Sequence, residues 1–161
     1  MKRLNNNDMT NQQLQDLIKP WFENLEFTEE ATEFLTVTVP KENLHDLAEK
    51  LKSTAETQFD YLFCETGMDW GETLGVIYHL RSTTLGHEMV VKVETNDRSA
   101  ANLDTVCDIW RTAELNEREI HDLFGIKFNN HPNMEVLILP PDWEGYPLRK
   151  DYVDDINMII R

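Results

Sequence analysis

Residues that can carry out chemistry are closely spaced in one short stretch, between Trp110 and Gly125. It contains Glu117, Arg118, Glu119, His121 and Asp122. Carboxylates and imidazoles can bind metal ions or move protons. A metal site here would combine Glu119, His121, Asp122 and His131, but their spacing matches no recognised metal-binding pattern. The sequence also lacks a glycine-rich nucleotide loop and a nucleophile with a base beside it.

The same stretch predicts a helix with an odd member on its apolar face. The residues that share this face at helical spacing are Trp110, Ala113, Glu117, Ile120 and Phe124. Gly125 stands where a C-terminal glycine would end the helix. A buried carboxylate needs a cation or hydrogen-bond donors, because leaving it unpaired is costly. His121, one turn on, is a candidate partner for Glu117.

The charged side of this helix allows two interpretations. Arg118 is spaced to pair with both Glu114 and Asp122. Exposed pairs of this kind contribute little to stability, so one interpretation is a solvated helix face. The other is a polar face that meets another protein subunit. Helical spacing alone leaves both open.

The two cysteines, Cys64 and Cys107, are far apart in the sequence and form no CxxC pair. A four-cysteine iron–sulfur or zinc site therefore cannot be built from this chain alone. We expect both to be reduced thiols in the core of an intracellular protein.

Composition restricts the partners of the chain. Its 161 residues carry a formal net charge of −15, which would repel nucleic acid and anionic lipid headgroups. The apolar runs are shorter than the roughly 20 residues that span a bilayer. The polar start, Met1 to Asn7, lacks the apolar segment of a cleavable signal. We expect a soluble protein that does not bind nucleic acid and reaches a membrane only indirectly, through a partner.

The elements that position these residues follow from the apolar pattern. A helix is expected to begin at the capping pattern Thr10 to Gln13 and to kink or end near Pro20. Pro40 opens a second helix. Strands are expected at 34–39, 61–64, 74–80 and 88–93, and helical character at 103–110 and 110–124. This order predicts an α+β fold: a small mixed β-sheet with helices packed on one face.

From residue 129 onward the amino-acid composition changes. Four prolines and a glycine within sixteen residues exclude long regular elements: Pro132, Pro140, Pro141, Gly145 and Pro147. Trp143, Tyr146, Leu148 and Tyr152 are too apolar for a solvated linker. We therefore divide the chain into an α+β domain, 1–128, and a proline-rich extended C-terminal tail, 129–161, that docks on a partner.

Three linked blocks stand out along the chain: Glu117-Arg118-Glu119 with Asp122 and Gly125, then His131-Pro132, then Gly145 with Pro147-Leu148-Arg149-Lys150-Asp151. Together they resemble the signature of the C-type subunit, also called the 30 kDa-type subunit, of proton-pumping NADH:quinone oxidoreductase (respiratory complex I). The first hundred residues are similar to the family only in length and in the order of elements. The chain departs from the family by having Glu135 and Val136 where a pair of arginines is usual, and Leu115-Asn116 where an aromatic residue is usual.

The resemblance implies a peripheral-arm subunit with no cofactor of its own. FMN, the iron–sulfur clusters and quinone are expected in partner subunits. The expected neighbour is the quinone-reducing subunit of the complex, which we call the D-type subunit. The chain would then sit on the cytoplasmic side of the bacterial plasma membrane, or the equivalent organelle face. It would support electron transfer from NADH to quinone by positioning the D-type subunit.

The resemblance also gives the signature residues structural roles. Gly145 and Pro147 would fix a bend. Arg149, flanked by Lys150 and Asp151, would make a two-pronged contact with a carboxylate of the D-type subunit. On that basis Arg149→Lys is expected to weaken assembly and to leave the melting temperature of the domain unchanged. His131 is expected to be a hydrogen-bonded structural histidine.

Two other functions remain open at this point. The first is the equivalent subunit of an energy-converting hydrogenase or of a ferredoxin- or plastoquinone-linked complex, which shares these motifs. The second is a free-standing, non-enzymatic adaptor domain with the same fold. Association with the D-type subunit and quinone-reductase activity would distinguish the adaptor from a member of complex I.

Overall fold

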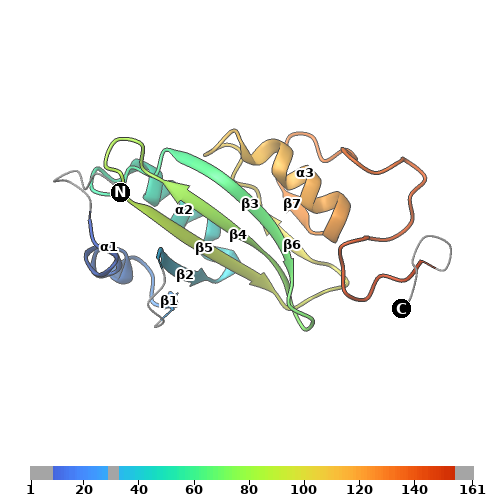
Figure 1. Cartoon of the computed structure of the whole chain (residues 1–161), viewed down its shortest axis with the longest axis horizontal. Coiled ribbons are helices and arrows are strands. Elements are labelled where there is room, and N and C mark those ends of the chain that lie inside the picture. Colours follow the sequence, from blue (N-terminus) through green and yellow to red (C-terminus); the bar gives the residue numbers. More distant parts are fainter. Residues whose placement is uncertain (1–8, 29–32, 155–161) are drawn as a thin grey trace.

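The computed structural model describes residues 9–28 and 33–154, and most of them surround a five-stranded mixed sheet (Figure 1). The strands lie in the order β1-β2-β5-β4-β3. Their bounds are Glu26–Phe27 (β1), Leu35–Val39 (β2), Tyr61–Asp69 (β3), Leu74–Arg81 (β4) and Glu88–Thr95 (β5). β2 is parallel to β5, and the other neighbouring pairs are antiparallel. The predicted α+β fold is confirmed.

Alternation along the strands explains which face is covered. In β2, Leu35, Val37 and Val39 are buried and the two threonines between them are partly exposed. Successive side chains of a strand point to opposite faces, so the apolar set lines one side of the sheet. In β4 the same side carries Tyr78 and Leu80. This side forms the core.

The first helix begins at its predicted capping residues, whereas α2 and α3 begin without a side-chain cap. Thr10 and Gln13 form a capping box ahead of α1 (Asn11–Ile18), and Pro20 lies in the following 3-10 turn η1 (Lys19–Trp21). A second 3-10 turn, η2 (Lys41–Asn43), leads from Pro40 into α2 (Leu44–Ser53). The third helix, α3 (Ala113–Phe124), ends at Gly125 in the left-handed conformation, with φ of 69°. This confirms Gly125 as the terminating glycine.

Two helices pack on the apolar face of the sheet. Leu44, Leu47 and Leu51 of α2 face Tyr78, Leu80 and Val91 across a small apolar gap. α3 lies on the same face, because Ile120 and Phe124 approach Gly67 of β3, whose register partner Val76 is buried on that side. Figure 1 shows α2 behind the sheet and α3 beside β3. The predicted helix-covered face is therefore present.

A second sheet has two strands, one before α3 in the sequence and one after it. β6 (Asn102–Asp104) and β7 (Lys127–Asn129) pair in parallel, with Leu103 opposite Phe128. The helical character predicted for 103–110 is wrong: residues 102–104 form a strand and 107–109 form turns. A parallel partner 25 residues away overrides the local pattern, and nothing local to residues 103–110 encodes it. β1 and β7 were not predicted either.

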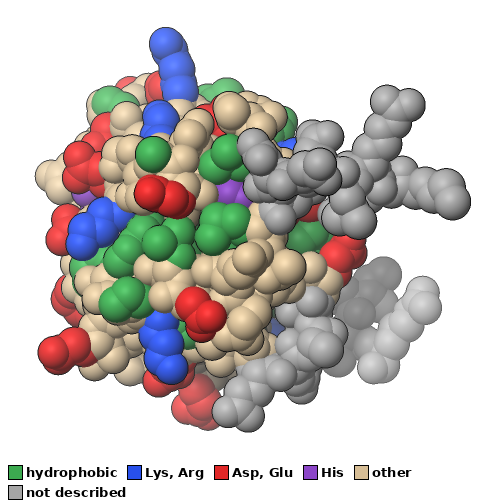
Figure 2. Space-filling view, turned by 90° about the vertical axis from the view of Figure 1, so that its left-hand side faces the viewer, with side chains coloured by type: hydrophobic (Ala, Val, Ile, Leu, Met, Phe, Trp, Pro, Cys, Tyr) green, Lys and Arg blue, Asp and Glu red, His purple; other side chains and the backbone are tan. Residues whose placement is uncertain are grey.

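The surface is strongly charged. Seen from the end of the molecule that carries the label of the N-terminus in Figure 1, acidic and basic side chains lie around a central group of hydrophobic ones (Figure 2). Among the described residues, no helix is long and apolar enough to cross a membrane.

Candidate functional site

Two side chains that precede α3 fix its start to β3 and to the segment just before β3. Trp110 donates its indole N–H to the carbonyl of Phe59 at 2.8 Å, and Thr112 donates its hydroxyl to the carbonyl of Leu62 at 3.0 Å. Further along, Gly67 leaves room for the ring of Phe124, which lies 2.5 Å from where a Cβ would stand. α3 is thus held near β3 both at its start and in its last turns.

Glu117 is buried in this interface, as the sequence predicted. It is 0% exposed. Its carboxylate accepts a hydrogen bond from the hydroxyl of Thr105 and another, of 2.8 Å, from the backbone N–H of Val106. Burial raises the pKa of this carboxyl to about 7. Glu117 therefore ties the loop after β6 to the middle of α3.

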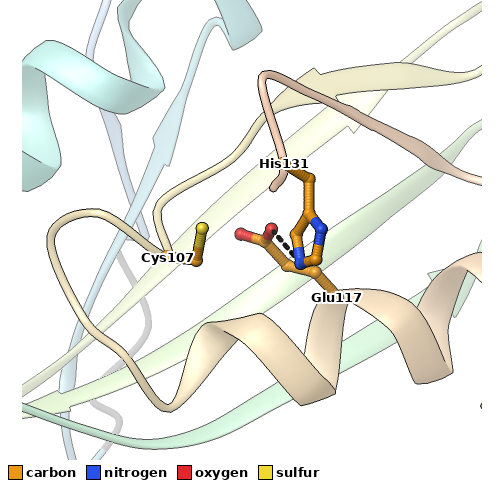
Figure 3. A group of neighbouring side chains, drawn as sticks. All are labelled: Cys107, Glu117 and His131. Atoms are coloured by element: carbon orange, nitrogen blue, oxygen red, sulfur yellow. Dashed lines mark ion pairs between the residues drawn. The ribbon is translucent and has the colours of Figure 1, made fainter. Parts of the chain in front are cut away.

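The predicted partner of Glu117, His121, is wrong. His121 Nδ1 instead contacts the carbonyl of Ile126 at 3.1 Å, just beyond the end of the helix. The histidine near Glu117 is His131, with 3.8 Å between His131 Nε2 and Glu117 Oε2. Figure 3 shows the carboxylate of Glu117 lying between the imidazole of His131 and the thiol of Cys107.

Cys107, Glu117 and His131 are the one group among the described residues close enough to suggest a metal site. The hydrogen bonds argue for a structural role. His131 Nδ1 accepts the N–H of Asn133 at 3.1 Å, so the neutral ring carries its hydrogen on Nε2, which lies 2.9 Å from the carbonyl of Glu114. A metal ligand would need a free lone pair on Nε2. Burial also raises the pKa of the Cys107 thiol, which disfavours the thiolate.

The alternative metal set from the sequence is not assembled. His121, Asp122 and His131 each contact backbone groups in different places, and Glu119 is exposed. These four side chains therefore serve separate parts of the structure.

One buried carboxyl near Glu117 was missed by sequence reasoning. Glu65 lies on β3 opposite Tyr78, on the core side of the sheet. Its oxygens are buried and have no hydrogen-bond partner among the described residues. Burial, followed by the charge of Glu117, raises the pKa of Glu65 well above its usual range. An alternating strand pattern places Glu65 on the core side, but Phe63 and Cys64 lie at a β-bulge that hides this pattern.

The polar face of α3 holds the first part of the tail. Arg118 donates Nε and Nη2 to the carbonyls of Glu135 and Val136, at 2.9 and 3.2 Å. Asp122 accepts the backbone N–H groups of Leu137 and Ile138 at 2.7 and 2.8 Å. The sequence predicted that Arg118 pairs with Glu114 and Asp122. Arg118 and Asp122 instead each bind backbone groups of the tail.

The C-terminal end of α3 holds the second part of the tail. The N–H of Leu148 donates to the carbonyl of Leu123 at 3.1 Å. Tyr146 and Arg149 lie directly over Gly125, so that a Cβ there would stand 2.4 Å from Tyr146. Arg149 stacks on Tyr146 and donates Nη1 to the carbonyl of Arg98 at 3.0 Å and Nε to that of Phe124. Its predicted contact with a partner carboxylate stays a prediction.

A cluster of charged groups, which we call the clasp, closes the tail onto β3. It consists of Asp69, Arg98, Lys150 and Asp151. Arg98 donates to both oxygens of Asp69 at 2.7 and 2.9 Å and lies 3.1 Å from Asp151. The N–H of Lys150 donates to Asp69 at 2.8 Å. The guanidinium of Arg98 holds the pKa of the Asp69 carboxyl well below its usual range.

The remaining signature residues lie at the surface of the tail. Pro132 and Leu148 are exposed, and the side chain of Lys150 also faces solvent. Gly145 has φ of 83°, a conformation that favours glycine, and Pro147 follows it. The signature therefore builds one continuous structure, in which α3 presents the tail.

Comparison with known proteins identifies the family. Residues 37–155 match the sequence model described as "Respiratory-chain NADH dehydrogenase, 30 Kd subunit". The chain belongs to this family. The resemblance found in the three signature blocks is confirmed, and it extends over most of the domain as well as the tail.

Relatives of this 30 Kd-type protein occur as separate and as fused chains. The fused C/D subunit of NADH-quinone oxidoreductase from Phocaeicola vulgatus is 48% identical over 122 residues, which are 75% of this chain and 23% of that protein. The C-type subunit of Chlorobium phaeobacteroides is 39% identical over 110 residues, 66% of each chain. The chain thus spans less than a quarter of the fused relative.

A solved structure extends the comparison beyond NADH-linked enzymes. A chain in the structure of the membrane-bound sulfane sulfur reductase, an archaeal respiratory membrane complex, superposes with a TM-score of 0.75 and 29% identity. The match covers 90% of this chain and 86% of that one. The same fold therefore occurs in respiratory membrane complexes with different reactions.

Proposed function

We propose that this chain is a non-redox peripheral-arm subunit of a proton-pumping NADH:quinone oxidoreductase. In this proposal it positions the quinone-reducing D-type subunit, and its tail, 129–161, docks there. FMN, iron–sulfur clusters and quinone belong to the partner subunits, and the chain reaches the cytoplasmic face of the membrane only through the complex.

The observation that carries the proposal is that the signature residues bind other groups of this same chain. Hydrogen bonds join the side chains of Glu117, Arg118 and Asp122 to backbone or side-chain groups of this same chain. The same is true of Arg149 and His131. These hydrogen bonds hold the tail against α3 and so determine the shape of the outward surface that the helix and the tail form together. This supports positioning of a partner as the role of the chain.

The test is to delete the chain from its native host and to restore it with an affinity tag. We expect the deletion to abolish NADH-dependent quinone reduction by membranes and the tagged chain to restore it. The D-type subunit should be recovered with the tag. Normal NADH:quinone activity without the chain would refute the proposal.

A second candidate is the equivalent subunit of a complex with another electron donor or acceptor. It is favoured by the similarity to a chain of the sulfane sulfur reductase. Assaying the same purified complex with NADH and with reduced ferredoxin, and with quinone and with polysulfide as acceptors, distinguishes the two. A tagged chain recovered alone from membranes would instead support a free-standing adaptor.

A further inference from the structure

Residues 135–139 form an outward-facing knob on α3. Asp122 accepts the backbone N–H groups of Leu137, Ile138 and Leu139, and Arg118 binds the carbonyls of Glu135 and Val136. The polar backbone of the segment is therefore turned inward, toward the helix. As a result Val136, Leu137 and Ile138 are 51%, 41% and 54% exposed.

Three consecutive exposed aliphatic residues are unusual when their backbone is so well anchored. A segment without hydrogen bonds could collapse to hide them, but five hydrogen bonds to two charged side chains of α3 hold this one open. A preorganised apolar projection loses little conformational entropy when it enters a pocket. Contiguous exposed apolar side chains of this kind mark interaction sites.

The charges beside the knob restrict what can cover it. Between His131 and Arg149 the sequence has no lysine or arginine, whereas Glu135, Asp142 and Glu144 are all acidic. These three side chains are exposed. An anionic membrane surface would repel them, because membrane-binding segments combine apolar residues with cations. A protein pocket with basic residues at its rim complements both features.

We propose that the knob, residues 135–139, inserts into an apolar pocket of a neighbouring protein whose rim carries lysine or arginine. This rests on the proposed function, because the neighbour is taken to be the D-type subunit of the same assembly. Arg118 and Asp122 act as positioning residues that present the knob, and Glu135 meets a cation of the rim.

The experiment compares four tagged forms of the full chain in the native host. They are the wild type, the knob variant Leu137→Asp/Ile138→Asp, the charge variant Glu135→Lys/Asp142→Lys/Glu144→Lys, and the control Tyr61→Asp. Tyr61 is 46% exposed on the opposite face of the sheet. Melting temperatures of the purified chains establish that each variant folds, which the exposure of every altered side chain favours.

We expect the D-type subunit to be recovered with the wild type and with Tyr61→Asp, and at least tenfold less with the knob and charge variants. Flotation of the purified chains with phosphatidylglycerol vesicles tests the membrane as occupant. A membrane site would be strengthened by the three lysines, whereas a basic-rimmed pocket would be weakened by them.

The outcomes separate the two proposals. Normal recovery of the D-type subunit with the knob variant would overturn the knob and leave the proposed function intact. Normal recovery with the charge variant, or vesicle binding by the chains, would overturn the basic-rimmed pocket. Absence of the D-type subunit from the wild-type preparation would overturn the proposed function, and the knob with it.

Discussion

Glu117 shows how a single carboxylate can organise a surface from inside. It lies where α3, the loop after β6 and the beginning of the tail converge, with Thr105, Val106 and His131 around it. Its polar atoms are satisfied by donors from a segment that is 11 residues away in the sequence. The residue is therefore a link between elements, and its chemistry as an acid is secondary.

Replacing Glu117 and Glu119 by alanine should separate the buried from the exposed carboxylate. In Glu117→Ala the hydroxyl of Thr105 and the N–H of Val106 lose their acceptor inside the protein. We expect a loss of about 1–3 kcal/mol in the free energy of unfolding. Glu119→Ala, at an exposed position, should stay within about 0.5 kcal/mol of the wild type. Equal melting temperatures for the two variants would contradict the role given to Glu117.

The raised pKa of Glu117 also predicts a pH dependence of stability. Because burial raises the pKa from 4.5 to about 7, the folded chain binds the proton more tightly than the unfolded chain does. This contribution is complete below pH 4.5 and is lost as the pH rises to about 7, by about 3 kcal/mol in all. Glu117→Gln removes the titrating group.

Urea unfolding between about pH 5 and 8 measures this effect. The stability of the wild type should fall over this range more steeply than that of Glu117→Gln. Glu65 is present in both proteins, but its pKa is raised by burial and then by the charge of Glu117, so the difference between the two curves reports Glu117 together with its effect on Glu65. Parallel stability curves would show that Glu117 is ionised throughout the range.

Residue-level prediction from the sequence succeeded where the signal was local. The burial of Glu117 follows from the spacing of α3, and the end of the helix follows from Gly125. The partners of Glu117, Arg118 and Asp122 did not follow, because most are backbone groups of distant segments. Every residue except proline has a backbone N–H, so the residue types do not indicate which N–H will bind a distant carboxylate.

At the scale of elements, α3 and the tail form one unit. The helix contributes the charged groups that bind the backbone of 135–139, and its C-terminal end carries Tyr146 and Arg149. The elements of the five-stranded sheet were mostly predictable, since alternation marks β2, β4 and β5. The pair β6–β7 was not, because each strand has three residues and its pairing partner lies on the far side of α3.

Gly125→Ala should release the second part of the tail. The left-handed conformation costs an alanine roughly 1–2 kcal/mol, and its Cβ would also strike Tyr146 and Arg149. Gly71→Ala is the matched control, because Gly71 has φ of 96° and nothing within 4 Å of a Cβ. Both variants should lose stability, but faster proteolysis between residues 140 and 154 is expected for Gly125→Ala alone. Equal cleavage rates would argue that the tail does not depend on Gly125.

At the scale of the whole molecule, the tail is both part of the fold and part of the expected interface. Its inward side makes hydrogen bonds with α3 and with Asp69 of β3, while Val136, Leu148 and Val153 are more than half exposed. The prolines and aromatic residues in the sequence predicted a tail that docks on a partner. The inward side could not be predicted, because it depends on Asp69 and Arg98, which lie outside the signature.

Arg149→Lys tests the inward side. A lysine cannot reproduce hydrogen bonds to the carbonyls of both Phe124 and Arg98. The structure therefore predicts a lower melting temperature for the isolated chain, by the equivalent of about 1–2 kcal/mol, where the sequence predicted no change. Lys150→Ala should leave it unchanged, since Lys150 reaches the clasp through its backbone. An unaltered melting temperature for Arg149→Lys would favour the contact with a partner carboxylate instead.

The clasp also has a consequence for the order in which the chain can mature. The hydrogen bond between Asp69 and the backbone of Lys150 joins residues 81 positions apart, and Lys150 follows every element of both sheets in the sequence. The sheet, α2 and α3 are complete in the nascent chain before this part of the tail leaves the ribosome. Until then the one clasp partner of Asp69 that the nascent chain can supply is Arg98. The surface that we expect to meet the D-type subunit can therefore be completed only after Lys150 has emerged, when every element of both sheets is already available.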